Sequence, residues 1–411
     1  MAYRRPDAVF RSRIGELEFP CEDGRYILYV SLACPWAAGT LQIARLKGLV
    51  GKLGSNEIGK MKLAVVHPTW QYTDPEQDKN KFSSDGLAGG VGIGEPHAGW
   101  VFAEPNKRLL PLALMKNGSQ FGLNLKGSAE DICSGKLGLE VMKTDGEEMN
   151  EKFLSEAAIL ENFGVRSAFS TSDPSRHQCK SLRHLYDIAV AQSDPEHKRW
   201  VRPTTPTIFD EKTDRIVSNE SIDIAKFLNT WGAGVGPDLY PEALRSQIDE
   251  KIEWIYAINN GVYRCGFATS QPAYDDATVL LEQRMVEVEK YMEDKKYLVG
   301  ETITIADVRL YNTLVRMDEV YVAYFKCGFA SLFFSICEQA PTRGEPAGPK
   351  TKYPNLLKFT ARIYNTYPEI AECTVMDDIR NHYFTSHAIR NMFAISPKEV
   401  GVIEKLKNME A

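Results

Sequence analysis

Residues 25–48 read RYILYVSLACPWAAGTLQIARLKG, and this stretch decides the fold. Its first part, residues 25–33, is short, rich in aromatic and β-branched residues and free of breakers, which predicts a buried strand. Residues 36–48 carry apolar side chains at helical spacing and end near a glycine, which predicts a helix. Residues 62–67, KLAVVH, predict a second strand. Strand, helix and strand form a βαβ unit, so the two strands are expected to lie parallel.

The rest of the first half indicates the same sheet, interrupted by one long insertion. Residues 104–180 show frequent glycine and no sustained periodicity, which is typical of an inserted excursion. A helix is predicted at 181–192, a β-hairpin within 202–221 and another helix at 222–231. We therefore expect βαβ, an insertion and then αββα, all around one sheet.

The second half is predicted to be entirely helical. A glycine-rich linker precedes it, and Thr304 to Asp307 resembles a capping box. A Pro- and Gly-rich excursion at about 328–351 separates the last two helices. Apolar residues recur at helical spacing in four segments: 241–260, 273–294, 305–326 and 354–366.

These patterns divide the chain into two domains. Residues 1–231 are expected to form an α/β domain, and residues 238–411 an all-helical domain with a C-terminal extension. The 411 residues are enough for two domains, and the 43% hydrophobic residues are enough for a sizeable core.

Charge and hydrophobic patterning limit the classes of partner. A net charge of −6 does not favour nucleic acid. The N-terminal segment lacks the apolar region of a secretory signal, and no apolar stretch is long enough to span a bilayer. We therefore expect a cytoplasmic protein with neither a nucleic-acid nor a membrane partner.

Eight cysteines are scattered along the chain. Because no CxxC pair and no combined Cys and His cluster occurs, neither structural zinc nor a disulfide scaffold is indicated. We expect reduced thiols and no bound metal.

Cys34 stands between the first predicted strand and the first predicted helix, directly before Pro35. Unpaired N–H groups in the first turn of a helix favour a thiolate, the reactive form of cysteine. Proline suits the first helical position, where no N–H is needed. With no second cysteine three residues on, exchange with an outside thiol would be monothiol. A buried small residue at a strand end is the alternative, and spacing alone leaves both interpretations open.

Two short polar motifs add weaker signals. A cis proline at Thr205-Pro206 would present the backbone of Thr205 to an extended peptide, and a trans proline opening an edge strand is the alternative. Ser221 is expected to cap the following helix, whose free N–H groups would bind a carboxylate, while Glu220 would take an ammonium group. A plain helix cap is the alternative. Together with Cys34, the two motifs match the layout of glutathione.

At this point the sequence resembles the glutathione transferase superfamily, and most closely its Xi class, the glutathionyl-hydroquinone reductases. The omega class is a near relative. The resemblance covers nearly the whole chain except the two insertions, and it implies a thioredoxin-like N-terminal domain followed by a helical C-terminal domain. The motifs that carry it are GRYILYVSLACPWA (24–37), VVHPTW (65–70), GWVF (99–102), TPTIFD (205–210), IVSNES (216–221), NNGVYRCGFATSQ (259–271), ITIADVRLYNTLVRMDEVYVAYFKC (303–327) and RNHYFTSH (380–387).

The resemblance implies a reductase that uses glutathione as co-substrate and acts on aromatic, hydroquinone-type small molecules. The Cys34 thiolate would attack the sulfur of a glutathionyl-hydroquinone, release the hydroquinone and hold glutathione as a mixed disulfide. A second glutathione would then release oxidised glutathione. The resemblance also implies a homodimer. The residues that it implies for glutathione binding are Trp100, Thr205, Pro206, Glu220 and Ser221.

For the aromatic acceptor, the resemblance implies that Tyr263 and Tyr383 line the pocket and that their hydroxyls bond the quinol oxygen. Phe384 stands where a second aromatic hydroxyl is usual. The histidines His67, His97, His382 and His387 are interpreted as structural or pocket-rim residues, because none has a metal-like partner at helical spacing.

One departure from the family pattern bears on function. Ala38 and Gly39 follow the Cys-Pro-Trp-Ala motif where histidine and arginine are usual, which removes a cation near the thiol. This departure supports an alternative function, a non-catalytic scaffold that binds glutathione or another ligand. A second alternative is an omega-type thioltransferase or dehydroascorbate reductase.

Overall fold

The structure is a computed structural model. Three short strands between 123 and 154, and residue 72, are described as backbone only. The residues that the structure describes fully are 7–55, 57, 59–71, 73, 98–112, 114, 160–161, 163–193, 201–333, 351–387 and 390–409.

The N-terminal domain is built on a four-stranded sheet with the strand order β11-β10-β1-β2. The strands are β1 (Tyr26–Val30), β2 (Lys62–Val65), β10 (Thr207–Asp210) and β11 (Arg215–Ser218). β1 and β2 are parallel and flank α1 (Pro35–Leu46) in the chain, so the predicted βαβ unit is confirmed. β10 runs antiparallel to both β1 and β11, which confirms the predicted hairpin.

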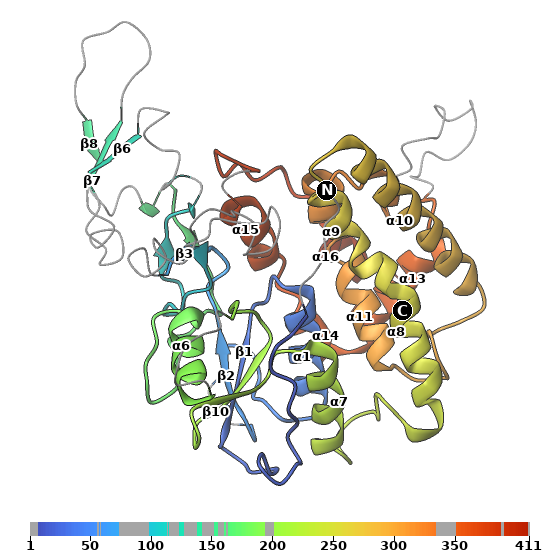
Figure 1. The fold of residues 1–411 in the computed structure, drawn as a ribbon. Helices are drawn as coiled ribbons and strands as arrows, with labels where there is room; N and C mark the ends of the chain where they lie inside the picture. The colour runs from blue at the N-terminus through green and yellow to red at the C-terminus, as the bar shows by residue number, and fades with distance from the viewer. Residues whose placement is uncertain are drawn as a thin grey trace, which may run out of the picture.

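Helices cover both faces of this sheet because side chains of β1 alternate between the faces. Leu28 and Val30 belong to the core that includes helices α1 and α7 (Ser221–Trp231). Ile27 and Tyr29 belong to a second core that includes α6 (Leu182–Ser193). Figure 1 shows α6 and the α1–α7 pair on opposite sides of the sheet.

The C-terminal domain is helical, as predicted. Its helices are η2 (Glu242–Leu244), α8 (Arg245–Asn259), α9 (Gly261–Gly266), α10 (Gln271–Tyr291), α11 (Ile305–Leu314), η3 (Met317–Tyr321), α12 (Val322–Tyr324), η4 (Gly328–Ala330), α13 (Pro354–Thr366), α14 (Pro368–Glu372), α15 (Met376–Ser386) and α16 (Val402–Lys407).

The capping box at the start of α11 is present. Asp307 accepts hydrogen bonds from the backbone N–H of Thr304 at 2.8 Å and of Leu298 at 2.7 Å. Burial raises the pKa of this carboxyl to about 6. These contacts assign Asp307 to the architecture of the helix.

The single helix expected over 305–326 is wrong. α11 ends at Leu314, and the chain continues through the π-helical turn η3 before a last short helical segment. At the break, the guanidinium of Arg316 donates to the carbonyl oxygen of Leu32 in the N-terminal domain, at 2.9 Å, and to that of Asn312 in α11, at 2.7 Å. A tertiary contact therefore overrides the local helical pattern.

The insertions are described only in part. The first contributes β5 (Arg108–Leu109), which pairs with β9 (Val165–Arg166), and a small sheet of β6 (Leu123–Lys126), β7 (Gly138–Val141) and β8 (Lys152–Leu154). A separate pair, β3 (Gln71–Tyr72) with β4 (Ala98–Gly99), lies outside it. Residues 113, 115–122, 127–137, 142–151, 155–159 and 162 of the first insertion and residues 334–350 of the second lie outside the described residues.

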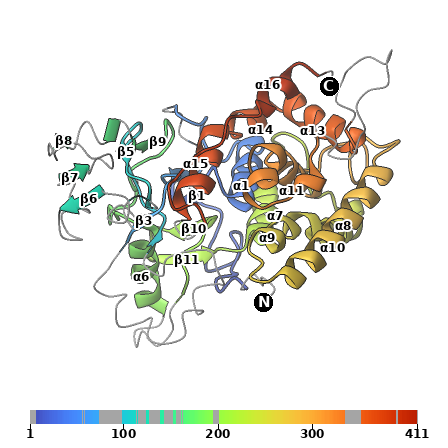
Figure 2. The same cartoon turned by 90° about the horizontal axis from the view of Figure 1, so that it is seen from above.

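The two domains meet through α1, which contacts both α11 and α14. Arg45 of α1 donates to Glu372 of α14 at 2.6 Å, and Gln42 accepts a hydrogen bond from Asn312 of α11 at 2.6 Å. Figure 2 shows α1 between the sheet and these helices. In the part of the chain that is described, no helix is both long and apolar enough to cross a bilayer.

Candidate active site

Cys34 occupies the junction between β1 and α1. It is the N-cap of α1, with extended backbone angles of φ −72° and ψ 118°, and Pro35 follows at the first helical position. Its Sγ atom lies 3.6 Å from the carbonyl oxygen of Thr205, and the residue is half-buried. The thiol is therefore partly exposed at the N-terminal end of a twelve-residue helix, which favours the reactive interpretation.

The Thr205–Pro206 peptide bond is cis, so this interpretation of the motif is confirmed. Pro206 directly precedes β10, the neighbour of β1 in the sheet, and this order brings Thr205 beside the Cys34 thiol. The Tyr186 hydroxyl of α6 supports the segment from the opposite face, at 2.7 Å from the hydroxyl of Thr207. The backbone beside the thiol is thus held by packing from the core.

The expectation that Ser221 caps α7 is wrong, because the helix begins one residue earlier than predicted. Glu220 is the N-cap, with its backbone extended, and its Oε1 accepts the N–H of Ile222 at 3.3 Å. Ser221 is the first helical residue, and its hydroxyl donates to the Glu220 carboxylate at 3.3 Å. Both polar side chains still stand together at the N-terminus of α7, the place expected for a carboxylate ligand.

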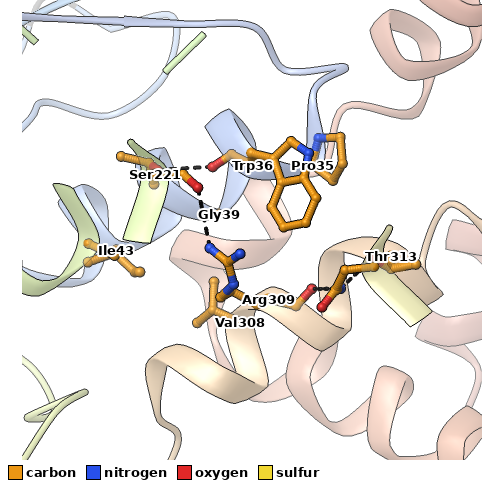
Figure 3. Close-up of a pocket in the computed structure, with 11 residues that line it drawn as sticks. Pro35, Trp36, Gly39, Ile43, Ser221, Val308, Arg309 and Thr313 are labelled. Atoms are coloured by element: carbon orange, nitrogen blue, oxygen red, sulfur yellow. Dashed lines mark hydrogen bonds between the residues drawn. The ribbon is translucent and has the colours of Figure 1, made fainter. Parts of the chain in front are cut away.

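A guanidinium from the helical domain reaches the same place. Arg309 of α11 donates from Nη1 to the hydroxyl of Ser221 at 3.3 Å, and its guanidinium carbon lies 4.7 Å from the Trp36 ring centroid. Figure 3 shows the Arg309 guanidinium between Trp36 and Ser221 in the pocket that these three residues help to line. The cation is therefore supplied across the domain boundary.

Gly39 explains how the two domains approach so closely here. A Cβ at this position would lie 3.3 Å from Nδ2 of Asn312 and 3.6 Å from a methyl group of Val308, both on α11. A long side chain at this position would collide with α11. Gly39 thus lets α11 pack on α1 and bring Arg309 to Ser221 at the N-terminus of α7.

Trp100 is buried, and its surroundings come from both domains. Its ring stacks on His382 of α15 at 4.6 Å between centroids and meets Trp70 edge-on at 5.6 Å. His382 Nδ1 lies 2.9 Å from the carbonyl oxygen of Pro68, and burial lowers the pKa of the imidazole to about 4. The ring is therefore neutral near pH 7, with its proton on Nδ1 because a carbonyl can only accept.

Two motifs from opposite ends of the chain meet at this point. The backbone N–H of Trp70 donates to the hydroxyl of Ser386 at 3.0 Å, and the hydroxyls of Thr69 and Thr385 lie 2.7 Å apart. Residues 67–70 are thereby joined to the C-terminal end of α15. His382 and its neighbours hold Trp100 rather than lining a rim, whereas His97 lies outside the described residues.

Three tyrosine hydroxyls gather opposite Cys34. The Tyr263 and Tyr383 hydroxyls are 2.5 Å apart, and that of Tyr321 lies 3.3 Å from Tyr383. Burial raises the pKa of Tyr263 and Tyr383 well above the usual value, and the charge of Cys34 contributes to this shift at Tyr263. The phenols therefore keep their protons at neutral pH and are placed to donate hydrogen bonds to an oxygen near the thiol.

Phe384 points away from these hydroxyls. Its ring lies 5.4 Å from that of Tyr324 and 5.8 Å from the guanidinium of Arg380. Neighbouring residues of a helix face different directions, so Phe384 and Tyr383 do not share a surface. The third phenol comes instead from Tyr321, in the π-helical turn.

Arg316 ties the thiol loop to this cluster. The fully buried guanidinium donates to the carbonyl oxygens of Leu32 at 2.9 Å and Ala33 at 3.2 Å, immediately before Cys34. Its charge opposes the upward pKa shift of Tyr383. Within the described residues no carboxylate pairs with it. Its hydrogen bonds to neutral carbonyl groups therefore hold it in place.

The structure brings all eight predicted site residues to one region between the domains. Three residues that support them were not predicted, and their sequence signal was their place inside the motifs that carried the resemblance. Those three are Arg309, Arg316 and Tyr321, whereas His382 was predicted as a structural or pocket-rim residue. Among the described residues, no group of three or more His, Cys, Asp or Glu side chains is placed to hold a metal ion.

Comparisons with known proteins agree with this geometry. Residues 271–362 match the family model described as glutathione S-transferase, C-terminal domain. The chain is 31% identical over 378 residues to the glutathionyl-hydroquinone reductase YqjG of Escherichia coli K12, covering 91% of this chain and 78% of the relative. It is 28% identical over 425 residues to glutathione S-transferase omega-like 2 of Saccharomyces cerevisiae, covering 96% and 94%.

Solved structures are similar over nearly the full length. The Xi glutathione transferase of Phanerochaete chrysosporium aligns with a TM-score of 0.63 and 27% identity, covering 98% of this chain and 94% of that one. The glutathione-bound structure of Escherichia coli YqjG aligns with a TM-score of 0.61 and 29% identity, covering 95% and 92%. The predicted fold class, a thioredoxin-like domain followed by a helical glutathione-transferase domain, is confirmed.

Proposed function

The chain belongs to the Xi class of glutathione transferases, and on that premise we propose that it is a glutathionyl-hydroquinone reductase. One observation in the structure supports this activity in addition to the family. A partly exposed thiol at a helix N-terminus, 3.6 Å from the Thr205 carbonyl, faces a cluster of protonated phenols. A nucleophile for sulfur and hydrogen-bond donors for a quinol oxygen are thereby combined in one site.

The reaction has two exchange steps. The Cys34 thiolate attacks the sulfur of the glutathionyl-hydroquinone, so that an S–S bond forms and the aromatic C–S bond breaks. The aromatic carbon takes the electron pair and a proton and leaves as hydroquinone. The thiolate of a second glutathione then attacks the Cys34-bound glutathione sulfur, which forms oxidised glutathione and returns the Cys34 thiolate.

The glutathione site is proposed from the residues around the thiol. The backbone of Thr205, beside cis-Pro206, would bond the cysteinyl part, and the indole of Trp100 would pack on the tripeptide. Glu220 and Ser221 at the N-terminus of α7 would hold the ammonium and carboxylate of the γ-glutamyl group. Arg309, bonded to Ser221, would add a cation for that carboxylate.

The phenols are proposed to act on the acceptor. Tyr263 and Tyr383 would donate hydrogen bonds to the quinol oxygen as negative charge develops during C–S cleavage. Because burial raises the pKa of both groups, they serve as donors and not as bases.

Intact-mass spectrometry tests the function directly. The full chain is mixed with one equivalent of a glutathionyl-hydroquinone without free glutathione, and a mass increase of one glutathione, mapped to Cys34, is expected together with released hydroquinone. Free glutathione should then restore the original mass. Binding of the conjugate without any mass increase would instead support the non-catalytic scaffold. A panel that includes dehydroascorbate and mixed disulfides separates the omega-type activities.

The Glu220→Gln variant is expected to raise the KM for glutathione about tenfold, or about 1.4 kcal/mol, with little change in kcat at saturation. Glutamine keeps the oxygen that caps α7 but loses the charge that would bind the ammonium group. The control is Asp223→Asn in the same helical turn, whose carboxylate pairs with Arg11 at 2.8 Å. An equal effect of both changes on KM would show that only the general charge of the helix end matters.

We further propose a cytoplasmic homodimer as the working form. The described cysteines are all free thiols, which supports a reducing compartment. Light scattering coupled to size-exclusion chromatography tests the assembly, and a monomer mass at micromolar concentration would contradict it.

A further inference from the structure

Two buried thiols, other than Cys34, lie behind the acceptor site and interact with each other. Cys265 of α9 and Cys327, which follows α12, are both buried and free, and each thiol shifts the pKa of the other. The segments that carry them are packed together. Gly266 lies directly against the Phe325 ring, where no Cβ would fit, and the rings of Tyr263 and Phe325 are 5.2 Å apart.

The two thiols differ in reactivity. The interaction with Cys327 lowers the pKa of Cys265, and that same interaction raises the pKa of Cys327 well above the usual value. Cys265 is therefore the more readily ionised member, and Cys327 stabilises its thiolate.

A surface contact lies beside the pair. The Tyr274 hydroxyl of α10 donates to the carbonyl oxygen of Lys326 at 2.6 Å in an exposed position. The Tyr274 phenol interacts electrostatically with both Cys265 and Cys327, so it lies beside them. Lys326 has a left-handed backbone, with φ of 59°. Local opening at this turn would expose the thiols without unfolding the core.

We propose that Cys265 and Cys327 form a second redox site, a dithiol that glutathione disulfide converts to an intramolecular disulfide. The Cys265 thiolate attacks one sulfur of glutathione disulfide, which forms a mixed disulfide and releases one glutathione thiolate. Cys327 loses its proton and attacks the Cys265 sulfur, which forms the internal disulfide and releases the second glutathione. Two electrons pass from the dithiol to glutathione disulfide, which is also the product of the proposed reaction.

The internal disulfide acts on the acceptor site through the segments that it joins. A covalent S–S bond is shorter than a contact between two thiols, so its formation must draw α9 toward residues 325–327. Tyr263 lies on α9, two residues before Cys265, and its hydroxyl meets that of Tyr383. A displacement of this size is expected to lower turnover of the hydroquinone conjugate at least tenfold. Accumulated product disulfide would thus slow the enzyme.

The chemical test uses the full-length Cys34→Ser variant with glutathione disulfide, so that it does not depend on turnover. Peptide mapping without reductant is expected to find Cys265 linked to Cys327. Cys327→Ser in that background should instead trap one glutathione on Cys265, and Tyr274→Phe should speed the linkage several-fold. A matched control, Cys373→Ser, removes a thiol that is buried elsewhere and should leave the linkage unchanged. Failure to find the linkage while both thiols stay free to alkylation in the denatured product would overturn the proposal.

The functional test compares wild type with Cys265→Ser and Cys265→Ala, so that a folding defect in one variant does not decide the result. After treatment with glutathione disulfide, wild type should lose turnover and regain it with dithiothreitol. The two variants should keep the turnover that they had before treatment. An equal loss in wild type and in both variants would place the effect at Cys34 and overturn the proposed coupling.

Discussion

The Cys34→Ser variant is expected to lose turnover of glutathionyl-hydroquinones by about 10³-fold or more. A serine hydroxyl stays protonated at neutral pH, and it cannot form the mixed disulfide that links the two exchange steps. The measurement is the steady-state release of hydroquinone, combined with intact-mass spectrometry that should find no bound glutathione.

Protein stability should change little in this variant. Cys34 is half-buried, and its thiol makes a single described hydrogen bond, at 3.6 Å to the Thr205 carbonyl. The thermal midpoint should therefore stay within a few degrees of wild type. Cys21→Ser is the control, because this thiol is exposed and lies outside the predicted site. Full turnover in Cys34→Ser would rule out the thiol mechanism, even if glutathione still binds.

The Tyr383→Phe variant is expected to lower kcat about 10- to 100-fold with little change in the KM for glutathione. The Tyr383 hydroxyl contacts both neighbouring hydroxyls, at 2.5 Å from Tyr263 and 3.3 Å from Tyr321. Its loss would remove the proposed donor to the quinol oxygen and the hydrogen-bond partner of the other two hydroxyls. A double variant with Tyr263→Phe should cost less than the product of the two single effects, because the hydroxyls act as one unit.

The pH profile gives an independent check on the phenols. Burial raises the pKa of Tyr263 and Tyr383 well above the usual value, so both remain protonated over the accessible alkaline range. No loss of kcat from phenol ionisation is therefore expected below about pH 10. Tyr297→Phe is the control, because its hydroxyl pairs with that of Tyr367 at 2.9 Å, away from the thiol. Equal losses in the Tyr297 and Tyr383 variants would indicate a general effect on packing.

Local signals were enough for the main elements of the fold. The run of β-branched and aromatic residues before Cys34 and the helical spacing after it predicted β1 and α1, and the pattern at Thr304 to Asp307 predicted the start of α11. These features depend on residues close together in the chain, and backbone sterics and short-range hydrogen bonds act over that range.

The choice between alternatives at the site needed more than local pattern. Spacing left Cys34 open between packing and chemistry, and the Pro206 bond open between two isomers. The pairing of β1 with β10 decides both the role of Cys34 and the role of Pro206, because it places Cys34 beside Thr205. These paired residues are about 180 positions apart in the sequence. A hydrogen-bonded sheet fixes this neighbour relation, and the local sequence of either strand does not contain it.

The sequence by itself determined the two-domain architecture and the thiol at the N-terminus of a helix. It also singled out the polar motifs at Thr205 and at Glu220-Ser221. Only the tertiary structure decided that Glu220 caps α7, that α11 stops so that Arg316 reaches Leu32, and that Tyr321 joins Tyr383. The physical reason is the distance along the chain over which each kind of interaction acts. Propensity and capping act within a turn or two, whereas these contacts exist only after packing has brought distant segments together and removed water from between them.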